Sequence, residues 1–364
     1  MTPDPSSALP RRASRSAEAA EHLRQLILAG TWPGLLPGEM DLARLLQVGR
    51  NTVRSALSQL EDEGLLKNRM GRRREVVTAG HLPVPKVNNK AVLLLAVPYH
   101  ALAPSTLLWM EALRLDLQGA GWLLQIQTEP AAFRRNPAAV LSSLTAASPG
   151  TVWILHRSTA AMQQWFQQQA LPAVIAGTQH AEITLPRVDT DYRATSRHAA
   201  ARLTSRGHRH LAVLTSKEGL AGDVESLAGF REGSSGNEVA VITHNNTPAG
   251  VIAALRPVFE GSRHPTVLFV LRAEHFATAL TWLLEKGVSI PAQVSLVCRD
   301  DEPFLQHLHP EPTRYRRSAE NFAKKLSRLV TSCSTDRRAG KLPGTLLMPE
   351  FLPGGTLGPA PKSH

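Results

Sequence analysis

The sequence predicts a small α+β domain of the winged helix-turn-helix type, followed by a larger, two-lobed α/β domain with parallel sheets. Two observations support this prediction. Within residues 15–78, short amphipathic stretches with a period near 3.6 precede a basic, hairpin-like segment. From residue 91 onward, apolar runs of strand length alternate with helical patterns, which is typical of parallel sheets covered by helices.

Length and composition exclude several classes of protein. A chain of 364 residues is too long for one ordinary hydrophobic core, so two or three folding units are expected. The longest apolar run, Ala91–Val97, is far shorter than a membrane span, so no membrane partner is expected. Residues 1–14 lack the apolar core of a secretory signal, and Cys298 and Cys333 have no paired or metal-like spacing. These features favour a cytoplasmic protein.

The distribution of charge favours a polyanionic partner. The chain carries 41 Lys and Arg against 30 Asp and Glu, a formal net charge of +11. Residues 67–74 concentrate five basic side chains with no acid: Lys67, Arg69, Arg72, Arg73 and Arg74. The competing interpretation of this run is a solvated, charged turn.

The elements of the smaller domain, residues 15–78, follow from apolar spacing and from helix breakers. Residues 1–14, with three prolines among serines, are expected to be disordered. A first helix follows, and Glu39–Leu46 forms a second. The third helix spans Asn51–Glu63, and its predicted buried stripe is Val53, Ala56, Leu57 and Leu60. Residues 65–77 alternate as a short hairpin, the wing.

The larger domain is expected at residues 91–356, after a proline-containing, semi-rigid linker at 79–90 and before a flexible tail at 357–364. The predicted strands are 91–97, 122–127, 151–155, 173–176, 211–214, 239–242, 266–270 and 294–297. Helical patterns separate most of these strands, for example at 107–119, 160–169, 192–206 and 276–286.

The strands form two sets that divide near Val188-Asp189, which predicts two lobes and a cleft. Lobe 1 is expected at about 91–188 and 313–340, and lobe 2 at about 189–312 and 341–356. The alternative of one continuous sheet would require eight or more strands and is less favoured.

The N-terminal motif resembles the GntR family of winged-helix regulators over about 65 residues. The matching positions are Leu36-Pro37-Gly38-Glu39, Val48-Gly49-Arg50, Thr52-Val53-Arg54, Ala56-Leu57, Leu60 and Gly64-Leu65. The resemblance implies that Arg50, Asn51, Thr52 and Arg54 face the DNA major groove. It also implies that the wing tip, with Gly71, Arg72 and Arg73, touches the minor groove or phosphates.

The chemistry of these side chains suits that role. Arginine can hold guanine bidentately, asparagine can pair likewise with adenine, and a threonine hydroxyl suits a phosphate. The structural alternative for Arg50 and Arg54 is a surface salt bridge with Glu61 or Asp62. The sequence departs from the family at Gly49, where a capping serine or threonine is usual, and at Met40, where a basic residue is frequent.

The remainder of the chain resembles the effector domain of the LacI family, which is similar to type I periplasmic binding proteins. The matching stretches are Val188-Asp189-Thr190-Asp191, Arg206–Leu214, Leu227–Phe230, Leu284–Pro291, Val294–Val297, Asp300-Asp301 and Pro310–Thr313. The resemblance implies a cleft for a small-molecule effector, with a carbohydrate or a nucleoside as the candidate classes. It also implies a homodimer and a hinge near residues 188–190 and 310–314.

The expected effector pocket differs from the family pattern at two anchors. Asp300 follows a strand at its carboxyl end, where open α/β sheets present ligand-facing side chains. The family's ligand-clamping arginine, however, aligns with Ser226, and its usual aspartate or asparagine aligns with Ala273. The candidate residues of the other lobe are Tyr99, Ser105, His156 and Arg157, for which packing is the alternative role.

No nucleophile elbow, phosphate-binding loop, dinucleotide fingerprint or metal-ligand spacing is present in the sequence, so neither catalysis nor a cofactor is expected. The expected function is a sequence-specific, effector-modulated regulator of transcription, with a repressor favoured and a near-palindromic operator. The alternative is a DNA-binding dimer whose cleft has lost its ligand. A transport binding protein is the third and least favoured interpretation.

Overall fold

The computed structural model describes residues 15–28, 31–32, 34–67, 73–76, 89–261, 264–335 and 344–361. The chain separates into two units, Met1–Val87 and Asn88–His364. The predictions for residues 1–14, for the wing tip around Gly71, for most of the linker and for the end of the tail lie outside the described residues. Asn89 and Lys90, at the end of the expected linker, begin strand β3.

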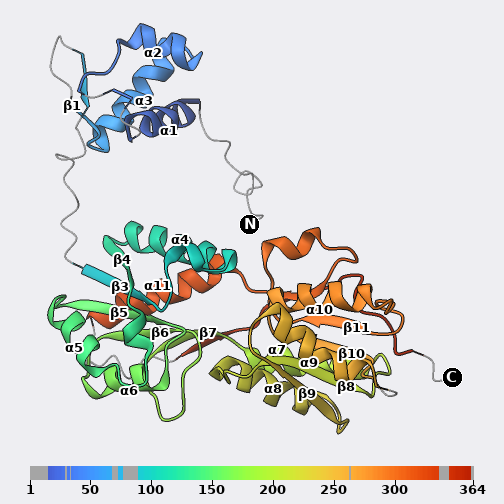
Figure 1. Cartoon of the computed structure of the whole chain (residues 1–364). Coiled ribbons are helices and arrows are strands. Elements are labelled where there is room, and N and C mark those ends of the chain that lie inside the picture. Colours follow the sequence, from blue (N-terminus) through green and yellow to red (C-terminus); the bar gives the residue numbers. More distant parts are fainter. Residues whose placement is uncertain are drawn as a thin grey trace, which may run out of the picture. The chain divides into compact units, whose positions relative to one another are not determined.

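The first unit is a helix-turn-helix domain with a short antiparallel strand pair (Figure 1). Its elements are α1 (Arg15–Leu28), α2 (Glu39–Leu46), α3 (Arg50–Asp62), β1 (Leu66–Lys67) and β2 (Glu75–Val76). The predicted stripe of α3 is fully buried, together with Leu23 of α1, Leu42 of α2 and Leu36, which precedes α2. Apolar spacing on three short helices is therefore enough to define this small core.

Lobe 1 of the second unit is built on a six-stranded sheet with the order β13-β7-β6-β5-β3-β4, paired in parallel throughout. Its strands are β3 (Asn89–Leu95), β4 (Trp122–Thr128), β5 (Thr151–His156), β6 (Ala173–Ala176), β7 (Arg187–Thr190) and β13 (Thr345–Leu347). Its helices are α4 (Pro104–Gly119), α5 (Ala138–Ala146), α6 (Ala160–Gln168) and α11 (Ala319–Thr335), and short 3-10 turns occur at η2 (Tyr99–Ala101) and η3 (Pro130–Phe133). Helices cover both faces of the sheet. The side chains of its central strands are therefore buried on both sides.

Lobe 2 is built on a second six-stranded sheet with the order β14-β12-β11-β10-β8-β9. Its strands are β8 (Leu211–Ser216), β9 (Val239–His244), β10 (Val267–Val270), β11 (Ser295–Cys298), β12 (Thr313–Arg316) and β14 (Glu350–Leu352). Its helices are α7 (Tyr192–Thr204), α8 (Ala221–Gly233), α9 (Pro248–Phe259) and α10 (Ala273–Glu285), and η4 (Pro303–His307) follows β11. Only the β12–β14 pair is antiparallel in this sheet.

The chain passes between the lobes at three places in the described residues: after β7, after β12, and between β13 and β14 (Figure 1). The two-lobed α/β architecture with parallel sheets predicted from the sequence is confirmed. The β12 strand lies in the lobe 2 sheet and β13 in the lobe 1 sheet, so the crossings fall at Arg316–Ala319 and Leu347–Glu350. Three chain crossings at one junction are the arrangement expected of a hinge between two lobes. Within the described residues, no helix is long and apolar enough to span a membrane.

Candidate nucleic-acid interface and effector cleft

The start of α3 presents polar side chains to solvent while its opposite face is buried. The chain leaves α2 through Gln47, which adopts a left-handed conformation with φ 52°, and enters α3 through the extended Gly49. Gly49 provides no side-chain cap, as its replacement of serine or threonine implies. Asn51 and Arg54 are exposed and Thr52 is half-buried. The helical period therefore separates a polar, outward face from the core stripe.

Glu39, the first residue of α2, interacts with three arginines. Its carboxylate accepts hydrogen bonds from Arg50 Nε at 3.3 Å, from Arg54 Nη2 at 3.2 Å and from Arg74 Nη1 at 3.1 Å. The hydrogen bond from Arg74 is the largest cause that lowers the pKa of Glu39 below its ordinary value. The single carboxylate therefore fixes the position of two α3 arginines relative to the wing strand.

The three arginines differ in exposure, and this separates their roles. The Arg50 and Arg54 side chains are 61% and 58% exposed, whereas Arg74 is 18% exposed and also donates to Glu61. The salt-bridge partner of Arg50 and Arg54 is thus Glu39, rather than Glu61 or Asp62. Arg74, directly before β2, forms salt bridges with both α2 and α3 and so stabilises the domain. The side chains of Arg50 and Arg54 remain mostly accessible to solvent.

The wing is described only in part. Arg73 is exposed and Lys67 is exposed at the end of β1. Gly71 and Arg72, which were predicted at the wing tip, lie outside the described residues. The exposed basic groups that remain are compatible with contacts to phosphates.

In lobe 2, the expected pocket position at Ser226 is occupied by the side chain of another residue, Arg299. Its Nη1 donates to Ser226 Oγ at 2.9 Å and to Asp223 Oδ1 at 2.8 Å. Its Nε and Nη2 donate to the two carboxylate oxygens of Asp300, at 3.0 and 3.2 Å. The guanidinium also lies 4.4 Å from the centre of the Tyr192 ring. Arg299 therefore connects β11, α8 and the start of α7.

The charge state of this cluster is set by burial and by the two carboxylates. The Arg299 side chain is 5% exposed, and burial alone would lower its pKa, but Asp300 and Asp223 raise that pKa above its ordinary value. A buried guanidinium with paired carboxylates stays charged. Sequence reasoning missed Arg299. The available signal was its position, a charged residue directly after the apolar strand β11 and directly before Asp300.

Ala273 is buried at the start of α10 and contributes no polar group to the cluster. Its neighbour Arg272 lies 4.0 Å from Asp223 Oδ2, measured from Nη2. His244 and His275 pack ring against ring nearby, with centroids 4.1 Å apart, and burial lowers the pKa of each to about 4. These histidines are uncharged packing groups at ordinary pH.

The four lobe 1 candidates differ in their surroundings. Ser105 lies in the first turn of α4 and hydrogen-bonds to Glu302 of lobe 2. Tyr99 is exposed within η2, and Arg157 adopts a left-handed conformation with φ 49°. His156 Nδ1 lies 3.1 Å from the Ala176 carbonyl oxygen, and burial lowers its pKa to about 4. His156 therefore has the packing role rather than that of a charged ligand contact.

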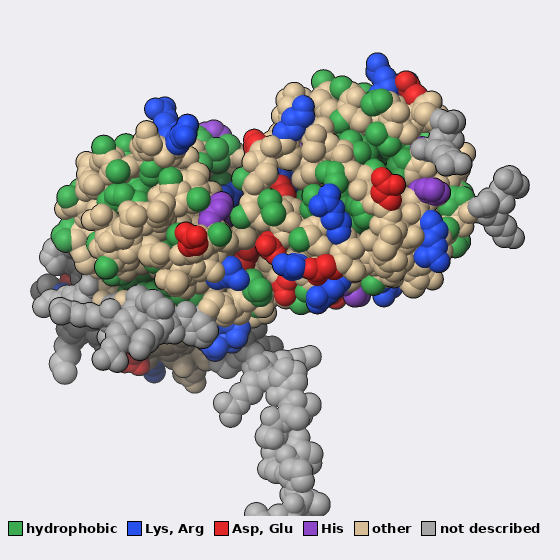
Figure 2. Space-filling view, turned by 90° about the horizontal axis from the view of Figure 1, so that it is seen from below, with side chains coloured by type: hydrophobic (Ala, Val, Ile, Leu, Met, Phe, Trp, Pro, Cys, Tyr) green, Lys and Arg blue, Asp and Glu red, His purple; other side chains and the backbone are tan. Residues whose placement is uncertain are grey.

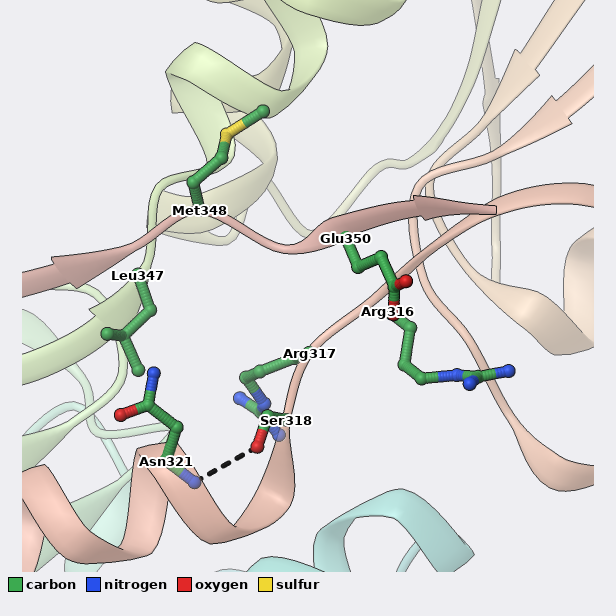
Figure 3. A pocket seen from close by; sticks show the side chains of 7 residues that line it. All are labelled: Arg316, Arg317, Ser318, Asn321, Leu347, Met348 and Glu350. Carbon is green, nitrogen blue, oxygen red and sulfur yellow. Dashed lines mark hydrogen bonds between the residues drawn. The ribbon is translucent and has the colours of Figure 1, made fainter. Parts of the chain in front are cut away.

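Side chains of both charges gather along the junction of the two lobes (Figure 2). One cavity at this junction has a volume of about 170 Å³ and lies where the chain crosses between lobes (Figure 3). It is lined by Arg316, Arg317, Ser318, Asn321, Leu347, Met348 and Glu350. Ser318 Oγ accepts the Asn321 N–H at the start of α11, and Arg317 stacks on Phe322. Among the described residues, no group of three or more His, Cys, Asp or Glu could hold a metal ion.

Two regions of the chain match known protein families. Residues 15–76 match the bacterial regulatory proteins of the gntR family, and residues 200–357 match the periplasmic binding protein-like domain. The chain thus carries one region that matches the gntR-family regulators and one region that matches the periplasmic binding protein-like domain. The HTH-type transcriptional regulator AscG of Escherichia coli (strain K12) is 28% identical over 125 residues. That alignment spans 33% of this chain and 37% of AscG.

Solved structures share the fold at low sequence identity. A putative transcriptional regulator LacI from Bacillus cereus subsp. cytotoxis NVH 391-98 has a TM-score of 0.66 at 15% identity, covering 74% of this chain and 99% of that one. A LacI family regulator from Enterococcus faecium with bound ribose has a TM-score of 0.62 at 16% identity, with 74% and 99% covered. The complex of the regulator CelR with cellobiose has a TM-score of 0.63 at 19% identity, with 88% and 100% covered.

Proposed function

We propose that this protein is a sequence-specific DNA-binding regulator of transcription, and a repressor in its simplest mode of action. The observation that supports this proposal is the exposed face at the start of α3, where Arg50, Asn51 and Arg54 lie on the side of the helix opposite its buried apolar stripe. A helix with this face fits the major groove, in which arginine and asparagine read guanine and adenine edges. Thr52 and Arg73, with Gly71 and Arg72 of the wing tip, contribute contacts to the DNA backbone.

The protein acts as a homodimer on a near-palindromic operator. Apolar side chains of lobe 1 support this, because Leu108 and Leu115 on α4 and Leu123 on β4 are each more than half exposed. The β4 strand lies at the edge of its sheet. Exposed leucines on one helix and an adjacent edge strand are typical of a surface that pairs with a second copy. Two DNA-binding domains then face two half-sites.

A small molecule in the cleft between the lobes modulates operator affinity in this proposal. The ligand acts through its preference for one arrangement of the lobes, and through that for one spacing of the DNA-binding domains. Two of the similar structures are complexes with ribose and cellobiose, which supports a carbohydrate as the effector, with a nucleoside as the other candidate. In the lobe 2 wall, Asp300 would accept hydroxyl hydrogens and Arg299 would hold that carboxylate in position.

A second candidate function is a DNA-binding dimer whose cleft serves only assembly. The favouring observation is that polar groups expected to meet a ligand already have protein partners: Asp300 pairs with Arg299, and Ser105 pairs with Glu302. In both cases the chain is not an enzyme and acts where the DNA is, in the cytoplasm.

Two measurements separate these functions. Mapping of bound genomic sites tests DNA recognition and indicates the metabolite class from the neighbouring genes. A thermal-shift panel of sugars, nucleosides and amino acids tests the cleft. Specific sites with no stabilising compound would favour the ligand-free dimer, and a stabilising sugar that also changes operator affinity would favour the effector-modulated regulator.

A further inference from the structure

A glutamate of lobe 2 is bound at the first turn of a lobe 1 helix. The backbone N–H of Ser105 donates to Glu302 Oε2 at 3.0 Å, and the Ser105 hydroxyl donates to Glu302 Oε1. Glu302 lies between β11 and η4 and is 8% exposed. The two residues are separated by 197 positions in the chain, so the contact joins the lobes directly.

The sequence of α4 explains why it accepts a carboxylate from another lobe. Its N-cap residue is Ala103, which has no side-chain oxygen, and its first residue is Pro104, which has no N–H. Ser105 therefore carries the first free amide hydrogen of the helix. A carboxylate at this end satisfies that donor and interacts favourably with the helix dipole. Glu302 thus performs the capping that α4 cannot provide for itself.

The surroundings of Glu302 indicate that the hydrogen bonds from Ser105 offset the cost of burying its carboxylate. Burial raises the pKa of Glu302, the Ser105 hydroxyl and N–H oppose that rise, and the nearby acids Asp300 and Glu274 add to it. Both of those neighbouring charges are negative, so they do not hold Glu302 in place. Separation of the lobes would return Glu302 to water and would leave the first turn of α4 without its cap.

We propose that Glu302 is a built-in latch that holds the two lobes together, with Ser105 as its receptor. An effector group that enters the cleft at Ser105 competes with Glu302, so that ligand entry is coupled to the release of this latch. This latch concerns the effector domain alone. It does not depend on DNA recognition, and it holds whether or not a natural effector exists.

The test measures the lobe separation in the full-length protein without ligand. Spin labels are placed on cysteines introduced at the exposed positions Ala101 and Gln306, which lie on the two lobes. The native Cys298 and Cys333 are buried, so they do not compete for the label. Labelled chains are mixed with an excess of unlabelled protein, so that only distances within one chain are read. The wild-type background is expected to give a narrow, short-distance peak.

Glu302→Ala is expected to lose that peak in favour of longer and broader distances, and Ser105→Ala, which keeps the backbone donor, is expected to lose it in part. Glu311→Ala is the matched control, because Glu311 is an exposed glutamate of the same region that pairs with Arg314. Circular dichroism and the melting temperature verify that each variant is folded. If Glu302→Ala does not fold, Glu302→Gln replaces it. A wild-type distribution that is already broad, or a folded Glu302 variant that keeps the short peak, would overturn the proposal.

Discussion

Arg299 donates a hydrogen bond to Ser226 Oγ over 2.9 Å, so a side chain from the end of β11 occupies the place at α8 where the LacI-like pattern has an arginine. A guanidinium is therefore present in this wall, although it comes from a different element. The same group fixes both oxygens of Asp300. Although Ser226 replaces the usual arginine, Arg299 therefore still provides a positive charge on the lobe 2 side of the cleft.

Arg299→Met should destabilise the protein by about 3–5 kcal/mol, because it removes the cation that hydrogen-bonds to Asp300 and to the buried Asp223. Chemical denaturation of the full chain measures this change. Arg193→Met is the control, because Arg193 is half exposed and pairs with Glu232 on the protein surface. An equal effect of the two substitutions would contradict the central position of Arg299.

Arg50→Ala should weaken binding to the operator by about 1–3 kcal/mol, while binding to unrelated duplexes is largely kept, because a base contact is lost. Titration of fluorescent duplexes measures both affinities. Arg44→Ala is the control, since Arg44 is an exposed arginine of α2 that pairs with Asp41. A uniform loss on all duplexes would indicate a phosphate contact instead of base recognition.

The wing arginines should separate into two effects. Arg73→Ala should reduce the salt dependence of DNA affinity by roughly one unit of slope, as expected for one lost phosphate contact. Arg74→Ala should mainly lower the melting temperature, because Arg74 ties β2 to Glu39 and Glu61. Affinity measured over a range of salt concentrations, with thermal melts, distinguishes the two. A salt slope unchanged by Arg73→Ala would refute the role of the wing in DNA binding.

Stability should fall on acidification between about pH 6.5 and pH 4. Burial lowers the pKa of His156, His244 and His275 to about 4, so the folded protein resists protons that the unfolded chain accepts. Their stabilisation is complete above the unfolded value and is lost as the pH falls, by at most about 2 kcal/mol per ring at pH 5. Asp189, whose pKa burial raises to about 6, acts in the opposite direction. Melts of His244→Gln/His275→Gln should show a smaller acid effect than the wild type, and an unchanged effect would exclude this pair.

Much of the architecture could be predicted because the parallel strands are apolar on both faces. The strands β3, β5, β8 and β10 are buried along their whole length or nearly so, and they read as continuous apolar runs. The edge strands β13 and β14 are three residues each and only partly buried, so no periodic signal marks them. Their sheet membership depends on pairing with distant segments.

The polar sites were less predictable, because their partners are remote in sequence. The alternative role for Arg50 was a salt bridge with Glu61 or Asp62 at the far end of its own helix, but its partner in the structure is Glu39, across the α2–α3 turn. Ser105 was predicted as a pocket residue. The sequence around it gives no sign of its partner Glu302, which lies 197 positions away in the chain. Spacing on one element predicts which face a residue occupies, whereas the partner across a tertiary contact follows from the packed fold.

The most direct test is selection of duplexes from a random pool by the full-length protein at moderate ionic strength, followed by sequencing. Enrichment of a two-fold symmetric sequence is expected, and a protein carrying both Arg50→Ala and Arg54→Ala should no longer select that sequence. Recovery of a pool with no sequence preference by the wild-type protein, in the presence or absence of the sugar and nucleoside panel, would contradict it.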